Sequence, residues 1–284
     1  MPHTLGLASG FFKHPTADSW RAALAAGFTD AELGFPWTLP PDEMFADALR
    51  SYAILREAGV RVSSAHLPFG PLWEPSNPDP AAREDALRRF EGLLDWVGAQ
   101  GIPLAVLHAS FEPIPSAERP ARLRTAADSV ARLDAYARER GVALAIENLP
   151  RTCLGNTAAE TLLLAGHAAG VCFDVNHLLT ETHAEFLAAA GQRVITTHLS
   201  DYDLADERHW FPGTGAIDWP ALPRALDAAG YTGRYIFELD EDGTPAMGQF
   251  TPARLAEALE KFWKTEGFFA AGATNRQNAI SNAK

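Results

Sequence analysis

Residues that can bind a metal ion or transfer a proton stand at the ends of six successive apolar segments. These residues are His66, His108, Glu147, Asp174, His198 and Glu238. Three of the last four are carboxylates, which would repel one another strongly if they met in one buried site. Each follows an apolar run, so a divalent cation would offset both that repulsion and the loss of solvent. The pattern predicts a metal-dependent active site with four ligands, namely Glu147, Asp174, His198 and Glu238.

The types of these ligands bear on the metal. Three carboxylates and one imidazole form a mostly hard set of oxygen donors, which suits Mn²⁺ or Mg²⁺. Manganese is the expected ion, with magnesium, cobalt and zinc as alternatives.

Further side chains are expected at the same site. His66, His108 and His177 are predicted to bind substrate or to orient the ligands, as neutral histidines commonly do. The alternative is that these imidazoles bind zinc, because they are numerous enough to hold more than one ion. His209, which precedes a Pro-Gly-x-Gly turn on a loop that could fold over the site, is also expected to bind substrate. Trp37 is expected to line a sugar site, with packing of its own loop as the alternative.

The apolar segments alternate with segments of helical periodicity. Strands are predicted at 4–9, 30–35, 60–68, 102–109, 142–148, 171–176, 193–199 and 234–239. Helices are predicted at 17–27, 42–58, 80–100, 117–140, 157–168, 182–190, 219–229 and 252–264. Strict alternation predicts a parallel sheet with helices outside it, and eight units close a single α/β domain, the (β/α)8 or TIM barrel. The carboxyl ends of all eight strands meet at one mouth of such a barrel.

Five joints repeat one pattern, in which a helix ends at a glycine and a strand follows at once. The glycines are Gly27, Gly59, Gly101, Gly141 and Gly230. Glycine is favoured just past a helix end because that position often takes a left-handed backbone. This recurrence is the strongest sign of repeated units.

Length and composition limit the classes of function that the chain could have. The 284 residues suit one barrel over 1–265, followed by a polar, loosely held tail over 266–284. A net charge of −12 opposes binding to nucleic acid or to an anionic membrane, and no apolar stretch is long enough to span a membrane. The two cysteines lack zinc-site spacing and the amino terminus lacks a signal peptide, so a cytoplasmic enzyme acting on a small carbohydrate is expected.

Four motifs carry a resemblance to a known family. They are Ile-Glu147-Asn148, Phe-Asp174-Val-Asn-His177, His198-Leu-Ser-Asp201 and His209-x-x-Pro-Gly-x-Gly-x-Ile-Asp218-Trp219. From about Leu5 to about Trp263 the chain resembles the xylose isomerase-like barrel superfamily, in its sugar phosphate isomerase/epimerase branch, to which endonuclease IV is related. Asp218 is also expected to cap the helix that follows it.

The resemblance implies roles for these residues. In the ketose epimerases of the superfamily the metal ligands match the four named above, the two glutamates form the catalytic acid/base pair, and a histidine matching His177 contacts substrate. Those enzymes commonly carry an arginine after the histidine of the seventh strand, where this chain has the residues 200–203, Ser-Asp-Tyr-Asp. Members often form homo-oligomers.

Endonuclease IV offers the other comparison. Its three-zinc set corresponds to His66, His108, Glu147, Asp174, His177, His198, His209 and Glu238, although its Asp-x-His pair here is Glu207-Arg-His209.

The expected function is a metal-dependent isomerase or epimerase of a sugar or polyol-derived ketose. Glu147 and Glu238 would transfer the proton through a metal-stabilised enediolate. A dehydratase or lyase sharing that first step is an alternative, and so is a zinc-dependent phosphodiesterase. No phosphate-binding cradle is evident, which favours an unphosphorylated substrate.

Overall fold

A computed structural model describes residues 3–167, 169–239 and 250–263. The predicted tail, 266–284, lies outside the described residues, as do residues 240–249, between the eighth strand and the last helix.

The eight predicted strands form a closed parallel barrel in sequence order. They are β1 (Leu5–Ala8), β2 (Phe28–Gly34), β3 (Arg61–His66), β4 (Leu104–Leu107), β5 (Ala143–Glu147), β6 (Gly170–Asp174), β7 (Val194–Leu199) and β8 (Tyr235–Phe237). Pairing of Leu5 with Tyr235 joins β1 to β8 and closes the ring. The prediction of a TIM barrel is confirmed.

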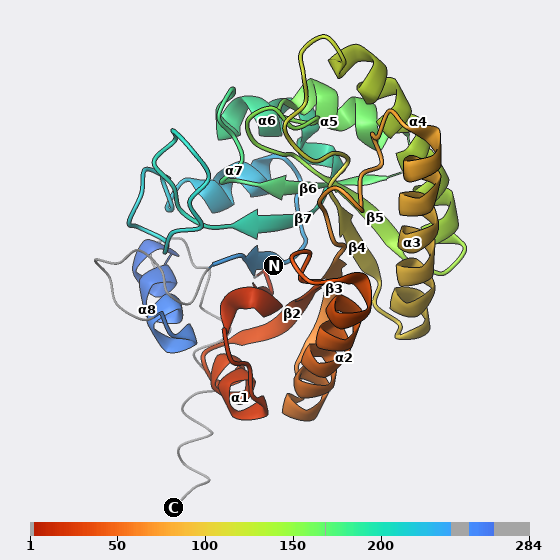
Figure 1. Ribbon diagram of the computed structural model, residues 1–284. Coiled ribbons are helices and arrows are strands. Elements are labelled where there is room, and N and C mark those ends of the chain that lie inside the picture. Colours follow the sequence, from red (N-terminus) through yellow and green to blue (C-terminus); the bar gives the residue numbers. More distant parts are fainter. Residues whose placement is uncertain (1–2, 168, 240–249, 264–284) are drawn as a thin grey trace, which may run out of the picture.

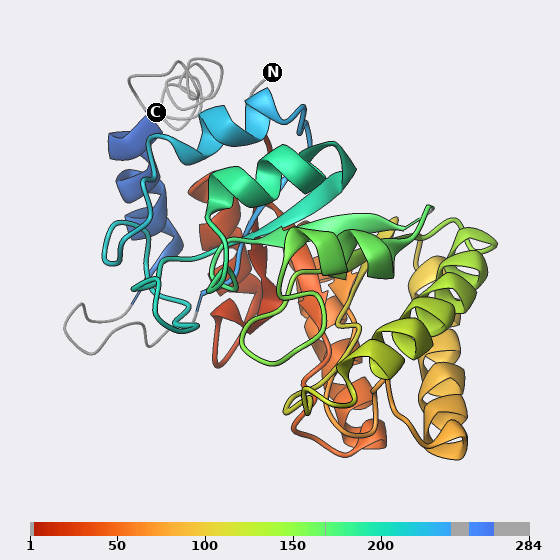
Figure 2. The ribbon, with the colours of Figure 1, turned by 90° about the horizontal axis from the view of Figure 1, so that it is seen from above.

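Helices surround the barrel (Figure 1). They are α1 (Ala17–Ala25), α2 (Pro41–Ala58), α3 (Pro80–Ala99), α4 (Arg119–Arg138), α5 (Ala158–Ala165), α6 (His183–Ala190), α7 (Leu222–Ala228) and α8 (Pro252–Trp263). The long helices α3 and α4 pack against each other, and the view from above shows them side by side (Figure 2). None of the helices in the described part of the chain is long and apolar enough to cross a membrane.

The repeated glycine joints have the backbone that the sequence predicts. All five glycines have positive φ, between 71° and 102°. At Gly59 the left-handed residue ends α2 directly, and its amide donates to the last turn of the helix. A residue with a side chain would be strained at each joint, so these glycines separate helix from strand.

The helix predicted at 219–229 is shorter in the structure, and Asp218 does not cap it. Asp218 accepts the amide hydrogen of Ala221 within a turn, and α7 begins only at Leu222. Trp219 is drawn into the core, where its indole nitrogen donates to Asp201. The tertiary contact of Trp219 therefore overrides the local helix signal.

Large aromatic side chains fill the layer between barrel and helices, and Trp20, Trp219 and Trp263 are almost completely buried. The barrel itself encloses a small apolar cluster of Leu104, Val106, Ala145 and Cys172. This packed interior supports the residues at the strand ends.

Candidate metal centre

The four predicted ligands converge at the carboxyl ends of the last four strands. In the sheet register Asp174 lies beside His198, on neighbouring strands β6 and β7. Glu147 ends β5, and Glu238 follows β8 directly. One ligand atom from each of the four residues lies within 4.8 Å of the others.

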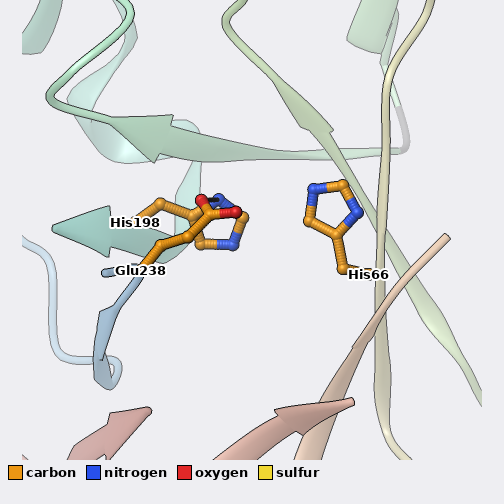
Figure 3. A group of neighbouring side chains, drawn as sticks. All are labelled: His66, His198 and Glu238. Atoms are coloured by element: carbon orange, nitrogen blue, oxygen red, sulfur yellow. Dashed lines mark ion pairs between the residues drawn. The ribbon is translucent and has the colours of Figure 1, made fainter. Parts of the chain in front are cut away.

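His198 stands at the centre of the group. Its Nδ1 atom is 3.2 Å from Oε1 of Glu147, 3.1 Å from Oε2 of Glu238 and 3.8 Å from Oδ2 of Asp174. Figure 3 shows His198 and Glu238 in contact, with His66 across from them. Glu147, Asp174 and His198 are fully buried, whereas the Glu238 side chain is 29% exposed and reaches the cavity.

The residues fit a divalent cation. Oδ2 of Asp174 is buried and has no hydrogen-bond partner among the described residues, which is costly for a carboxylate. This oxygen points at the group formed with Glu147, His198 and Glu238, where a cation would satisfy it. Three carboxylates and one imidazole are also the donor set expected for a hard metal ion.

The electrostatics show the repulsion that such a cation would relieve. Burial, reinforced by the charges of Glu147 and Glu238, raises the pKa of Asp174 to about 7. Burial also works to raise the pKa of Glu147, but His198 and His108 outweigh it and hold that pKa well below its usual range. The carboxylates of Asp174 and Glu147 therefore have pKa values shifted in opposite directions in one shared environment.

Two further predicted residues, His66 and His108, contact the other oxygen of Glu147. Nε2 of each lies 3.1 Å from Oε2 of Glu147. Nδ1 of His66 lies 2.9 Å from the carbonyl oxygen of Leu67, which can only accept, so a neutral His66 cannot donate on both sides. Burial alone would lower the pKa of His66, but the hydrogen bond and charge of Glu147 raise it to about 9.

His177 and His209 meet Glu207, which the sequence patterns left without a role of its own. Oε1 of Glu207 is 3.0 Å from Nε2 of His209 and 3.6 Å from Nε2 of His177. On its other side, Nδ1 of His177 hydrogen-bonds to the carbonyl of Asn148 at 2.9 Å. Burial alone would lower the pKa of His177, but the charge of Asp174 and the contacts with Glu147 and Glu207 raise it well above its ordinary value, so a protonated His177 turns a donor nitrogen towards Glu207.

The loop that carries His209 is organised by Asp201. This fully buried carboxylate accepts five hydrogen bonds, from the indole of Trp219 and from the amides of Tyr202, Gly213, Thr214 and Ile217. A side chain at Gly215 would lie 2.2 Å from the carbonyl oxygen of Tyr202. The Pro-Gly-x-Gly motif is thus required because the loop wraps closely around one carboxylate.

Replacing Asp201 by asparagine is expected to lower the free energy of unfolding by about 2–4 kcal/mol, because the amide group would face donors that need an acceptor. Denaturation in urea measures the loss. Asp203→Asn, on the same loop but one-third exposed, is the matched control and should cost less than about 1 kcal/mol. A D201N protein as stable as the unaltered chain would refute this role for Asp201.

Arg151 links the same loop to the loops that follow β4 and β5. Its guanidinium donates to Glu112 at 2.6 Å and to Asp206 and Glu207 at 2.9 Å each. Arg151 itself has a left-handed backbone, with φ at +50°. Such strain in a residue with a side chain persists only where the surroundings enforce it, as these three ion pairs do.

Two adjoining cavities, of about 540 and 310 Å³, open at this mouth. Trp37, His66, Phe69, His209 and Glu238 line both of them. Trp37 is 40% exposed, and its ring packs 5.0 Å from that of Phe69 and 5.8 Å from that of Phe111. The structure therefore places Trp37 on the cavity wall, apart from the ligand group.

One buried acid near the site was missed by the sequence patterns. Glu32, in the middle of β2, lies 2.7 Å from Nε2 of His198 through its Oε1 atom. The predicted site residues were chosen at strand ends, and Glu32 lies within its strand. The signal that could have found it is the alternation along β2, which places Glu32 on the same face as Gly34 at the mouth.

Comparison with known proteins places this geometry in context. A family model described as "Xylose isomerase-like TIM barrel" matches residues 20–265. A curated relative, the uncharacterized protein y4fM of Sinorhizobium fredii, is 27% identical over 228 residues, which cover 70% of this chain and 73% of the relative.

Solved structures share the fold. A D-tagatose 3-epimerase-like protein superposes with a TM-score of 0.72 at 19% identity, over 93% of this chain and 98% of the other. A D-psicose 3-epimerase of Clostridium cellulolyticum superposes with a TM-score of 0.70, also at 19% identity, over 94% and 99% of the two chains. At these identities the superpositions establish the architecture alone.

Proposed function

The chain belongs to the xylose isomerase-like TIM barrel family, and from that premise we propose that it is a divalent-metal-dependent isomerase or epimerase of a small carbohydrate. The observation that carries the proposal is the convergence of Glu147, Asp174, His198 and Glu238 within 4.8 Å of one another. The epimerase names of the structural neighbours favour the same chemistry.

The metal would be held by these four residues, with manganese as the expected ion. A divalent cation bound there would supply Lewis-acid polarisation of a carbonyl next to the C–H bond that breaks. The four side chains come from neighbouring strands of a rigid barrel, so little reorganisation is needed to bind it.

Glu147 and Glu238 would move the proton. Both line the smaller cavity, and each contacts Nδ1 of His198 through one oxygen. One glutamate would take the proton from the carbon beside the carbonyl, while the electron pair of that C–H bond forms a C=C bond and the π electron pair of the carbonyl moves onto its oxygen. The other glutamate would return a proton to the opposite face of the same carbon, and the electron pair would restore the carbonyl.

The surrounding residues would orient and enclose the substrate. His177 lines the smaller cavity, and its Nε2, which faces Glu207, can also donate a hydrogen bond to a sugar hydroxyl. Trp37, Phe69 and Phe111 form an aromatic wall on which the apolar face of a sugar can pack. The loop held by Arg151 would limit the access of water.

The test combines metal analysis with isotope exchange. About one manganese, magnesium or cobalt ion per chain is expected in gently purified protein by elemental mass spectrometry. Ketoses incubated with that protein in deuterium oxide should gain deuterium at the carbon next to the carbonyl, as detected by proton NMR. Bound metal without any exchange across a panel of ketoses would refute an isomerase or epimerase.

A zinc-dependent phosphodiesterase is the second candidate, and two further residue groups favour it. His66, His108 and Glu147 form one, and His177, Glu207 and His209 form the other, each with ligand atoms within 4.8 Å. The net charge of −12 opposes a nucleic-acid substrate. Two or three zinc ions per chain, together with cleavage of phosphodiesters, would support this candidate over the first.

A further inference from the structure

Glu32 is a buried carboxylate that the proposed reaction does not use. It lies on β2, two residues before the end of the strand, and its exposed fraction is 1%. The hydroxyl of Ser64 donates to its Oε2 atom at 2.7 Å. Its Oε1 atom faces Nε2 of His198, also at 2.7 Å.

The same strand holds a second buried acid, Asp30, whose burial has a different cause. Asp30 is paired with the guanidinium groups of Arg61 and Arg234, at 2.7–2.8 Å. These two cations account for its burial. Glu32 has no arginine or lysine partner within the described residues, so His198 is its only ion-pair partner there. A buried carboxylate held only by an imidazole and a hydroxyl is costly for stability. We therefore expect Glu32 to have a role other than stabilising the fold.

The two ring nitrogens of His198 face different carboxylates, which indicates the role of Glu32. Its Nδ1 atom faces the carboxylates of Glu147 and Glu238, whereas Nε2 is turned to Glu32. Nε2 and Oε1 of Glu32 lie 2.7 Å apart, although neither makes a well-aligned hydrogen bond to any described group. A proton kept on Nε2 by this carboxylate leaves the lone pair of Nδ1 free to bind a cation.

We propose that Glu32 is a positioning residue that fixes the orientation and tautomer of His198 and thereby strengthens cation binding at the four-ligand site. The inference rests on the proposed function only in requiring that this site binds a divalent cation. It does not depend on which carbohydrate is converted, or on whether one is converted at all.

The test measures cation affinity rather than activity. The full chain, freed of metal, is titrated with Co²⁺ in a calorimeter, and the visible absorption of bound cobalt is recorded. Glu32→Gln is expected to weaken Co²⁺ binding by about 10–100-fold, the usual effect of removing such a partner. The absorption band should also shift, because a glutamine amide can donate to Nε2 and so favour a proton on Nδ1.

Asp30→Asn is the matched control, since it makes the same chemical change at an equally buried acid on the same strand. D30N should lower the urea midpoint of the metal-free protein and leave Co²⁺ affinity and absorption unchanged. A purely structural role for Glu32 predicts the same behaviour for E32Q, so Co²⁺ affinity within twofold of the unaltered chain would overturn the proposal.

Glu32→Asp covers the case in which E32Q does not fold. It keeps the charge but withdraws the carboxylate from Nε2, and should weaken Co²⁺ binding by several-fold. E32D that binds Co²⁺ as the unaltered chain does would count against positioning. Weakened binding in a protein that converts no ketose would support positioning while the proposed function fails. If the unaltered chain is an active epimerase but the Glu32 variants bind Co²⁺ as it does, the proposed function would stand and the positioning role of Glu32 would fail. An unaltered chain that binds no Co²⁺ would overturn both the proposed function and the positioning role.

Discussion

Replacing Glu147 by glutamine is expected to reduce turnover by about 10²–10⁴-fold, because an amide cannot take the proton from the substrate carbon. The side chain keeps its size and one oxygen that can still bind a cation. Its contact with His66 also becomes weaker, since an amide is a poorer partner for imidazolium than a carboxylate. Steady-state kinetics on the ketose found by isotope exchange measures the loss.

Glu238→Gln is the matched variant, because it makes the same change at the other glutamate of the pair. In a two-base epimerase each variant should lose deuterium exchange with one epimer and retain part of it with the other. The two variants should therefore show opposite preferences. Full turnover in E147Q, or the same exchange pattern in both variants, would contradict the assignment of the acid/base pair.

Removing the divalent cation is expected to abolish turnover and to lower the melting temperature. Without a cation, Glu147, Asp174 and Glu238 converge in a buried space, and Oδ2 of Asp174 has no partner among the described residues. A cation that binds only the folded chain stabilises it by about 4 kcal/mol at a thousandfold excess over its dissociation constant. For a domain of this size that corresponds to a rise of roughly 10 °C.

The measurement is thermal unfolding of chelator-treated protein with Mn²⁺, Mg²⁺, Co²⁺ or Zn²⁺ added back, with activity recorded in parallel. The ion that restores turnover identifies the functional metal. Asp174→Asn provides the control, since it should respond much less to the same ions. A melting temperature that is unaffected by chelation and by every ion would contradict a metal centre at these residues.

Much of the architecture followed from the sequence because its causes are local. Helical periodicity and apolar strands alternate along the chain, and each structural unit is built mainly from neighbouring residues. The five glycine joints could be predicted because only glycine adopts their left-handed backbone without strain. Parallel strands then carry Glu147, Asp174, His198 and Glu238 to one mouth, so a metal site could be predicted from four separate strand ends.

Other features were decided only by the tertiary structure, because they depend on contacts across the closed barrel. A glutamate in the middle of a strand has the same local pattern whether it meets solvent, an arginine or an imidazole, so Glu32 could not be linked to His198 in advance. Asp201 was visible in a motif, but its five donors come together only when the loop wraps around it.

The sequence by itself determined the barrel and the strand ends that carry the ligands, since periodicity and backbone preference act over a few residues. Which imidazole meets which carboxylate was set by barrel closure and side-chain packing, since those contacts join residues far apart in the chain.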